Sequence, residues 1–517
     1  MSTSESTRRD FLKAIGFGAA TSSVARSARA EVTVTPLRID PAPRHDLSPY
    51  LYMQFMEPLG TTDGSVAAAW DFAHDRWRED VIEVTKELGP PLMRWGGAFI
   101  SYYRWREAVG PRGLRKPMLN MCWGGIDTNQ VGTHEFVDFC RQTGADPFMC
   151  VNLLSDGRPY WQKTPKGDIR SADASEAADW VRYCNDPDST ERRAHGVNEP
   201  YDILLWQIGN ETSMDSKNRL FDCDTAAKHT VDFAKAMRAA DPRIKLVGWG
   251  DKVWARRMTQ LAGEHIDYIA FHHMFNPDRN IPNSPLRDTD YRKDPAWTWE
   301  RLMEAHKDHD AAIRAVREEV EDLPIPLALT ECHFALPGRN RCEVLSSWAA
   351  GVANARMLNV NERHGDKLKI ATAADFCGTR WQVNAVMIPV PSGRSYMMPV
   401  ALVMSLYRHH TGEKAVQVIE APGELDVTAS RTGDRFYFHV INTHRRRDIE
   451  TELNVAGMQI GPGRVFTLVA DPEAEVIETK TDVVTLKEEP LPTDGRVSFP
   501  AASVSAVEAE ARRGSNG

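Results

Sequence analysis

Two glutamates stand at the carboxyl ends of apolar runs and could carry out acid–base and nucleophilic chemistry together. The run that begins at Tyr201 ends in Gly209-Asn210-Glu211, and the run 326–331 ends in Glu331. A retaining glycosidase uses two carboxyl groups about 5–5.5 Å apart: one attacks the anomeric carbon, and the other protonates the leaving oxygen and then activates water. Asn210 could hold a sugar 2-hydroxyl beside them. Either glutamate alone is best explained as a strand end in solvent, but the two together favour Glu211 as acid/base and Glu331 as nucleophile.

Short apolar runs alternate with longer amphipathic stretches between these residues. Eight runs rich in Val, Ile, Leu and Phe lack a clean polar alternation, as parallel strands buried on both faces do. They are 50–56, 91–96, 146–153, 204–210, 244–250, 268–274, 326–331 and 370–376. Amphipathic stretches at 80–88, 134–143, 225–240 and 299–321 predict helices.

This alternation predicts an α/β fold, a (β/α)₈ TIM barrel over residues 45–410. In such a barrel catalytic groups lie at the carboxyl ends of strands, and the two glutamates would end strands four and seven. An open doubly wound sheet is the alternative. It usually carries a Gly-rich phosphate turn, and none is visible after residue 30.

The chain changes in texture after about Thr411. Short strand-like segments separated by turn residues predict an antiparallel β-sandwich over 411–510. They are 415–420, 424–429, 434–442, 448–455, 464–469, 483–487 and 495–499. We expect the segment 31–44 to add an N-terminal strand to this sandwich, and 511–517 to be a disordered tail.

The first thirty residues predict a twin-arginine signal peptide. Residues 7–13, TRRDFLK, precede a weakly apolar run at 14–21, and Ala28-Arg29-Ala30 forms a small-x-small cleavage site. We therefore expect a mature protein that is periplasmic or secreted. No later stretch is long and apolar enough to span a bilayer, so no membrane contact is expected after export.

The overall composition excludes several classes of partner. Acidic residues number 72 against 63 Lys and Arg, for a formal net charge of −9, and no basic stripe is visible. Nucleic acids and anionic membranes are therefore poor partners. The eight cysteines form no Cys-x-x-Cys pair, which argues against a structural zinc site, so neither a metal nor a cofactor is expected.

Short motifs follow one another in a fixed order along 33–410. Besides the Gly-Asn-Glu at 209–211, they are 55–60 (FMEPLG), 94–99 (RWGGAF), 103–105 (YRW), 109–111 (VGP), 132–136 (GTHEF), 180–185 (WVRYCN), 267–272 (DYIAFH) and 381–384 (WQVN). In this order the chain resembles glycoside hydrolase family 51, the α-L-arabinofuranosidases, within the clan of retaining glycosidases on this barrel. The resemblance implies a barrel followed by a C-terminal β-sandwich.

The resemblance also implies a role for each matching position. Glu211 corresponds to the acid/base and Glu331 to the nucleophile of an exo-acting enzyme that needs no cofactor. The other matches are Glu57, Asn210 and Gln382, which would bind sugar hydroxyls, and Arg94 and His272, which would support the carboxylates. A cation at Arg94 would keep Glu331 ionised, as a nucleophile requires. The family further implies an oligo- or polysaccharide substrate and a homo-oligomer.

Two positions depart from the family pattern. Ala98 replaces the asparagine of the family's Gly-Gly-Asn, and Met274 replaces the tyrosine of its His-x-Tyr. Each change removes a polar contact from the region of sugar recognition, and a site that loses such contacts binds the original sugar less well. We therefore hypothesise a shifted glycone, for example the larger galactofuranose.

Three other interpretations stay open. The protein could be a retaining glycosidase on another glycan, such as a galactofuranoside or a β-glucoside. It could be an exported carbohydrate-binding protein with an inactive barrel, although the presence of both glutamates argues against this. It could also be a cofactor protein exported by the twin-arginine route, but no metal or nucleotide motif supports that possibility.

Overall fold

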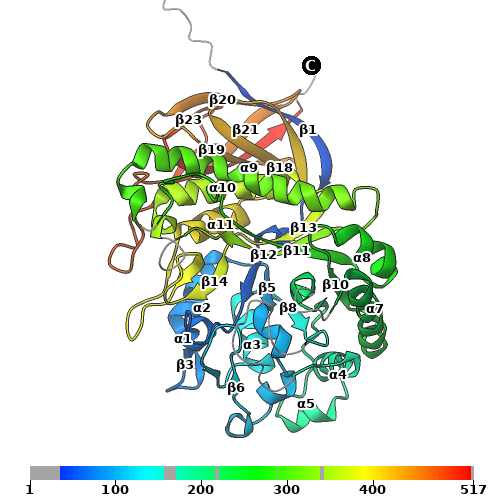
Figure 1. Ribbon diagram of the computed structural model, residues 1–517. Coiled ribbons are helices and arrows are strands. Elements are labelled where there is room, and N and C mark those ends of the chain that lie inside the picture. The colour runs from blue at the N-terminus through cyan, green and yellow to red at the C-terminus, as the bar shows by residue number, and fades with distance from the viewer. Residues whose placement is uncertain (1–34, 156–169, 216–220, 288, 338–342, 514–517) are drawn as a thin grey trace, which may run out of the picture. The chain divides into compact units, whose positions relative to one another are not determined.

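Eight parallel strands form one sheet at the centre of the molecule (Figure 1). The structure, a computed structural model, describes residues 35–155, 170–215, 221–287, 289–337 and 343–513. The strands are β2 (Gln54–Met56), β5 (Leu92–Trp95), β8 (Asp146–Val151), β9 (Leu205–Ile208), β10 (Lys245–Trp249), β11 (Tyr268–Phe275), β12 (Leu327–Phe334) and β13 (Leu368–Ala371). Met53, just before β2, donates a backbone hydrogen bond to Ala371 of β13 (3.0 Å), which brings the first strand beside the last. The predicted TIM-barrel class is confirmed.

Side chains from seven of these strand regions fill the barrel interior. One buried cluster combines Met53, Leu92, Phe148, Val247, Trp249, Ala270, Ala328 and Ile370. Such a packed layer explains why the strands appear as apolar runs in the sequence, since both of their faces are buried.

Helices connect and cover the strands. The main ones are α2 (Glu79–Leu88), α3 (Thr133–Thr143), α4 (Ala174–Asn185), α7 (Cys223–Ala240), α8 (Ala255–Ala262), α9 (Pro295–Glu319), α10 (Trp348–Arg363) and α11 (Pro399–His409). Aspartate side chains cap the starts of α4, α7 and α9 by accepting backbone N–H groups three residues later. The four helices predicted from amphipathic stretches are all present, with ends that differ by at most four residues.

Two predicted strands differ from the structure. The run 50–56 begins as a 3₁₀ turn (Pro49–Tyr52), because Ser48 caps it and a proline opens it, so only Gln54–Met56 is strand. The run 370–376 is broken after Ala371. The chain turns there and begins β14 (Asp375–Gly378), which pairs with β15 (Asn384–Met387) in a separate small sheet that also contains β16 (Tyr396–Met397). This break places Asp375 at the start of a new strand.

A nine-stranded sheet makes up the C-terminal part. It contains β1 (Leu37–Asp46), β17 (Lys414–Glu420), β18 (Leu425–Thr432), β19 (Arg435–Asn442), β20 (Ile449–Val455), β21 (Gln459–Val469), β22 (Thr485–Pro490), β23 (Arg496–Phe499) and β24 (Ser503–Arg512). Apolar side chains from eight of the nine strands share one core. The pairing is antiparallel except between β1 and β20, which run parallel.

The sequence analysis missed β24, which lies between β19 and β21 in the sheet and includes Ala511 and Arg512, two residues that were expected to belong to a disordered tail. Its second half, Val-Glu-Ala-Glu-Ala-Arg, alternates but uses alanine and glutamate, which have low strand propensity. Burial between two long partners therefore overrides local propensity in this strand.

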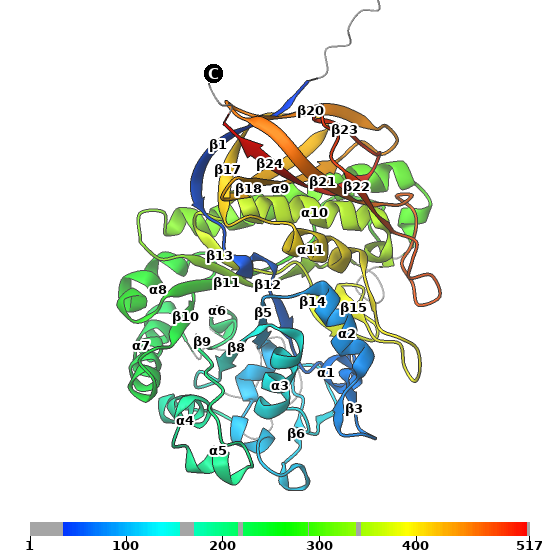
Figure 2. The same cartoon turned by 180° about the vertical axis from the view of Figure 1, so that it is seen from behind.

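Helix α10 joins the barrel to the nine-stranded sheet, and both views show it between the sheet and the barrel strands (Figure 2). The buried Asp426 of β18 accepts hydrogen bonds from Arg356 (2.8 Å) and Asn359 (3.0 Å) and pairs with Arg363, all on α10. Burial raises the pKa of Asp426, but the two guanidinium groups outweigh it and lower that pKa to about 2. The ionised carboxylate therefore stabilises the junction.

Replacing Asp426 by asparagine is expected to destabilise the protein at pH 7 by roughly 2–4 kcal/mol, because the half-buried Arg356 and the more exposed Arg363 lose the buried carboxylate that pairs with both. Because the pKa of Asp426 is lower in the folded protein than in the unfolded chain, its ionisation stabilises the fold fully above about pH 4. This contribution is lost as the pH falls towards 2. The difference in urea midpoint between the two proteins should therefore shrink over that range. Glu424→Gln, which removes an exposed pair with Arg447, serves as the control and should change stability by under about 1 kcal/mol.

No helix in the described ranges has the length and apolar character needed to cross a membrane. The predicted signal peptide, 1–30, lies outside the described residues.

Candidate active site

The two sequence-predicted carboxylates meet at the carboxyl-terminal end of the barrel. Glu211 follows β9, and Glu331 lies within β12; both are buried. A carboxylate oxygen of each and a ring nitrogen of His272 all lie within 4.8 Å of one another. The geometry thus brings three of the predicted site residues into one cluster.

Arg94, at the end of β5, hydrogen-bonds to Glu331 of this cluster and to two neighbouring side chains. Its guanidinium is fully buried and donates to Glu331 Oε1 (2.8 Å), Asn210 Oδ1 (2.5 Å) and Gln207 Oε1 (3.0 Å). Burial raises the pKa of Glu331 above its ordinary value, although His272 and Arg94 act in the opposite direction. Charge-assisted bonds of this kind favour the ionised carboxylate and fix its orientation.

Glu211 has a strained backbone and an unusual acidity. Its φ of +52° lies in the left-handed region, which costs of order 1–3 kcal/mol for a non-glycine residue and recurs at functional sites. Burial raises the pKa of Glu211 to about 7, with Arg94 opposing the rise. Near neutral pH this side chain can therefore give up a proton and take it back.

His272 bridges the acid to the barrel wall. Its Nδ1 lies 2.9 Å from Glu211 Oε1, its Nε2 lies 2.9 Å from Thr330 Oγ1, and its ring packs edge-on against Trp249. Burial lowers the pKa of His272 to about 3, so the ring is neutral. Because a threonine hydroxyl can donate or accept, the imidazole can carry its proton on either nitrogen and adapt as Glu211 gains or loses its own.

Glu57 follows β2 and supplies a third buried carboxyl group. It accepts hydrogen bonds from Trp123 Nε1 (2.8 Å) and, more weakly, from the backbone of Phe99 (3.4 Å). Burial, together with the charge of Glu331, raises the pKa of Glu57 well above its ordinary value. A protonated Glu57 can both donate to and accept from a hydroxyl.

Gly97 makes room for Glu57, because a Cβ at this position would lie 2.2 Å from the Glu57 Cδ and its φ is +145°. Gly97→Ala is expected to displace the carboxyl and lower kcat/KM roughly 10- to 100-fold, since one well-placed polar contact is worth about 1.5–3 kcal/mol. Gly113→Ala is the matched control, since a Cβ there meets nothing within 4 Å. Equal activities of the two variants would refute this role of Gly97.

The remaining predicted residues differ in their placement. Asn210 is buried, and since its oxygen accepts from Arg94, it has its NH₂ group left to offer a hydroxyl. Gln382 lies half-buried in the turn between β14 and β15, where its amide donates weakly to the Arg380 carbonyl (3.5 Å); it does not hydrogen-bond to Glu211 or Glu331. Ala98 is buried beside Gly97, and Met274 lies half-buried in β11.

Two supporting residues escaped the sequence analysis. Gln207 fixes the Arg94 guanidinium, and a polar side chain within the apolar run 204–210 was a usable signal for it. Trp123 holds Glu57 and packs edge-on against Trp381, but no local pattern in its loop marks it.

In the part of the chain that the structure describes, the one group of acidic, histidine and cysteine side chains close enough to share a metal is Glu211, His272 and Glu331. Arg94 already neutralises Glu331 at 2.8 Å and would repel a second cation. This arrangement therefore fits acid–base and nucleophilic chemistry better than metal binding.

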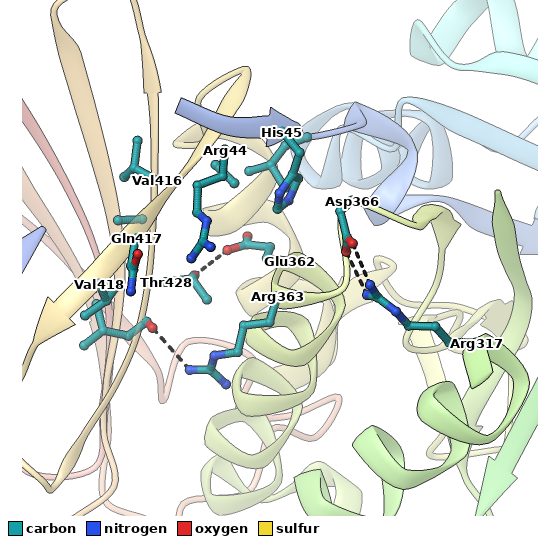
Figure 3. A pocket seen from close by; sticks show the side chains of 14 residues that line it. Arg44, His45, Arg317, Glu362, Arg363, Asp366, Val416, Gln417, Val418 and Thr428 are labelled. Carbon is teal, nitrogen blue, oxygen red and sulfur yellow. Dashed lines mark hydrogen bonds and ion pairs between the residues drawn. The ribbon is translucent and has the colours of Figure 1, made fainter. Parts of the chain in front are cut away.

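A pocket of about 620 Å³ lies elsewhere, between β17, β18 and the end of α10 (Figure 3). Several of its charged side chains are paired: Arg317 with Asp366 (2.7 Å), and Glu362 with Tyr52 (2.5 Å) and Thr428. The pocket lies where β13 begins, at the amino-terminal end of the barrel strands and away from Glu211 and Glu331. It is a polar junction between barrel and sheet, not part of the carboxylate cluster.

Comparisons with known proteins agree with this fold. Residues 84–293 match the model of the alpha-L-arabinofuranosidase 1 domain, and residues 337–503 match that of the alpha-L-arabinofuranosidase C-terminal domain. The "Intracellular exo-alpha-(1->5)-L-arabinofuranosidase" of Acetivibrio thermocellus is 32% identical over 246 residues, which are 44% of this chain and 46% of that protein. Relatives at this level of identity are thus matched over less than half of their length.

Two longer matches have lower identity. The "Probable alpha-L-arabinofuranosidase C" of Aspergillus flavus is 24% identical over 89% of this chain and 94% of its own. The family 51 α-L-arabinofuranosidase structure from Thermotoga petrophila superposes with a TM-score of 0.70 at 24% identity, covering 92% of this chain and all of the other, and shows a common fold. The chain therefore matches the models of both alpha-L-arabinofuranosidase domains and shares the fold of this family 51 structure.

Proposed function

We propose that the protein is a retaining, exo-acting α-L-arabinofuranosidase. The single observation that carries this proposal is the close approach of Glu211 and Glu331: one carboxylate oxygen of each lies within 4.8 Å of the other. Retaining glycosidases hold their carboxyl groups about 5–5.5 Å apart, whereas inverting enzymes separate them by about 6.5–9.5 Å to admit a water molecule. The two domain matches and the related arabinofuranosidases favour the same substrate class.

In the first half-reaction, Glu331 attacks the anomeric carbon and forms an ester with the sugar, while Glu211 gives its proton to the leaving glycosidic oxygen. In the second, the ionised Glu211 takes a proton from water, the hydroxide attacks the anomeric carbon, and the ester bond to Glu331 breaks. Two inversions leave the product with its original configuration. Arg94 supports the first step because it stabilises the anionic form of Glu331.

The hydrogen-bond partners of the two carboxyl groups fit this division of labour. Arg94 contacts Glu331 directly, whereas the nearest partner of Glu211 is a neutral imidazole. Glu211, with a pKa of about 7, is therefore the better proton carrier, and Glu331 the better nucleophile.

A galactofuranoside is the second candidate substrate. The buried Ala98 and the half-buried Met274 offer no hydrogen bond in the region where the family's sugar contacts would lie. A glycone of different size could be accommodated there.

We further propose, from residues 1–30, that the protein is exported by the twin-arginine route.

Hydrolysis of a panel of 4-nitrophenyl furanosides and pyranosides, with NMR of the first-formed sugar anomer, tests the proposal. We expect release from α-L-arabinofuranoside with retained configuration. Release from another glycoside alone would preserve the mechanism and move the substrate, whereas an inverted product would refute the double displacement. Silence on every glycoside would refute the enzymatic assignment.

A further inference from the structure

The alternation of side chains along β11 and β12 identifies which residues face the barrel interior. Cys332 Sγ lies 3.8 Å from His309 Nδ1, and His273 Nε2 lies 3.7 Å from an Asp308 carboxylate oxygen, so these two side chains face helix α9. Because neighbouring residues of a strand point to opposite faces, the side chains on either side of them point inward.

The inward-facing residues form two successive levels. His272 pairs in register with Glu331, and one step nearer the carboxyl end of the strands Met274 pairs in register with His333. Met274 and His333 therefore stand directly above the catalytic level, on the side from which a sugar reaches Glu331. His333 was not singled out in the sequence.

His333 faces a second buried polar group at this level. Its Nε2 lies 3.5 Å from Asp375 Oδ1, and the two residues are only 3% and 7% exposed. Its Nδ1 lies 2.7 Å from the Phe334 carbonyl, which can only accept, so Nδ1 carries a hydrogen. The carboxylate of this pair can accept a hydrogen bond, and the ring Nε2 can donate one when it is protonated or accept one when it is not.

Asp375 also belongs electrostatically to the sugar site. Its charge is one of those that raise the pKa of Glu57, the carboxyl group beside Trp123. Asp375 reaches this position because β13 ends at Ala371 and the chain restarts as β14. Asp375 therefore lies close enough to Glu57 for their charges to interact.

We propose that His333 and Asp375 together bind a hydroxyl group of the glycone and select which furanose the enzyme accepts. This inference rests on the proposed glycosidase function. A hydroxyl between them would donate to the Asp375 carboxylate and accept from a protonated His333, or donate to either group alone. The pair supplies hydrogen bonds at the level where Met274 supplies none.

Binding in the Glu331→Gln background tests the pair without requiring turnover. The probes are 4-nitrophenyl α-L-arabinofuranoside and its 2-, 3- and 5-deoxy analogues, or the same series on whichever furanoside the panel selects, with Kd from calorimetry. Asp375→Asn and His333→Gln are added separately, and their melting temperatures are measured. His273→Asn, a histidine of the same region that faces α9, is the matched control.

We expect each variant to weaken binding of the parent glycoside roughly 10- to 100-fold and to leave one deoxy analogue unchanged, because that analogue lacks the contacted hydroxyl. Equal weakening of all analogues would indicate a purely structural role and overturn the proposal, as would no weakening. If the unsubstituted protein hydrolyses no furanoside but this pattern holds, the enzymatic proposal fails and the binding assignment stands. No furanoside binding at all would refute both.

Discussion

Replacing Glu331 by glutamine is expected to lower kcat by about four orders of magnitude or more, the size of loss seen when a catalytic nucleophile is removed. The amide cannot form the glycosyl ester, yet it keeps the shape of the side chain and can still accept from Arg94, 2.8 Å away. Steady-state hydrolysis of the best furanoside in the panel measures the effect. The melting temperature checks that the protein stays folded when the buried Arg94 no longer has an ionised partner.

A chemical rescue separates this role from a general loss of activity. In Glu331→Ala, azide can occupy the emptied space and attack the anomeric carbon once, so the glycosyl azide should have inverted configuration. A glycosyl azide of retained configuration would contradict the assignment of Glu331 as nucleophile. Gly113→Ala, with an open surface at its Cβ, should show neither loss nor rescue.

The second large effect is expected at Glu211. Glu211→Ala should lower kcat/KM about 10²- to 10⁴-fold for glycosides with poor leaving groups, the usual contribution of a general acid. It should have little effect on 2,4-dinitrophenyl furanosides, whose leaving group needs no proton. Azide should restore turnover with retained configuration, because it attacks the glycosyl enzyme from the face that water uses.

The pH profile gives an independent reading of Glu211. Its protonated form is the active one in the first step, so kcat/KM should fall as the pH rises through about 7, the pKa to which burial raises this side chain. The fall should disappear in Glu211→Ala and persist in the control His273→Asn. If kcat/KM of Glu211→Ala still fell as the pH rises through about 7, another group would be the proton donor.

The fold was largely predictable because its strands are buried on both faces. Apolar runs at 146–153 and 244–250 correspond to β8 and β10 with only small changes at their ends. The error at 370–376 arose because two short strands of different sheets follow each other with only Thr372, Ala373 and Ala374 between them. In β24, pairing with two long strands overrides the low strand propensity of its residues.

The site was predictable where chemistry is concentrated in one short motif. Gly209-Asn210-Glu211 and Glu331 could be found from strand ends, and the structure brings them together. Residues that act by meeting a distant partner could not: Trp123 reaches Glu57 across 66 positions, and His333 faces Asp375 from another strand. Only the folded chain sets such pairs side by side.

Strand β1 has a consequence for how the protein is made. It pairs with β17 and β20, so its partners are synthesised only after the whole barrel, roughly 20–75 s later at 5–20 residues per second. Until then it is an unpaired edge that could join other chains. Its sequence, LRIDPAPRHD, carries two prolines and five charged or ionisable residues after Leu37, features that discourage edge-to-edge association. The composition of β1 thus limits its association with other chains during the time before β17 and β20 are synthesised.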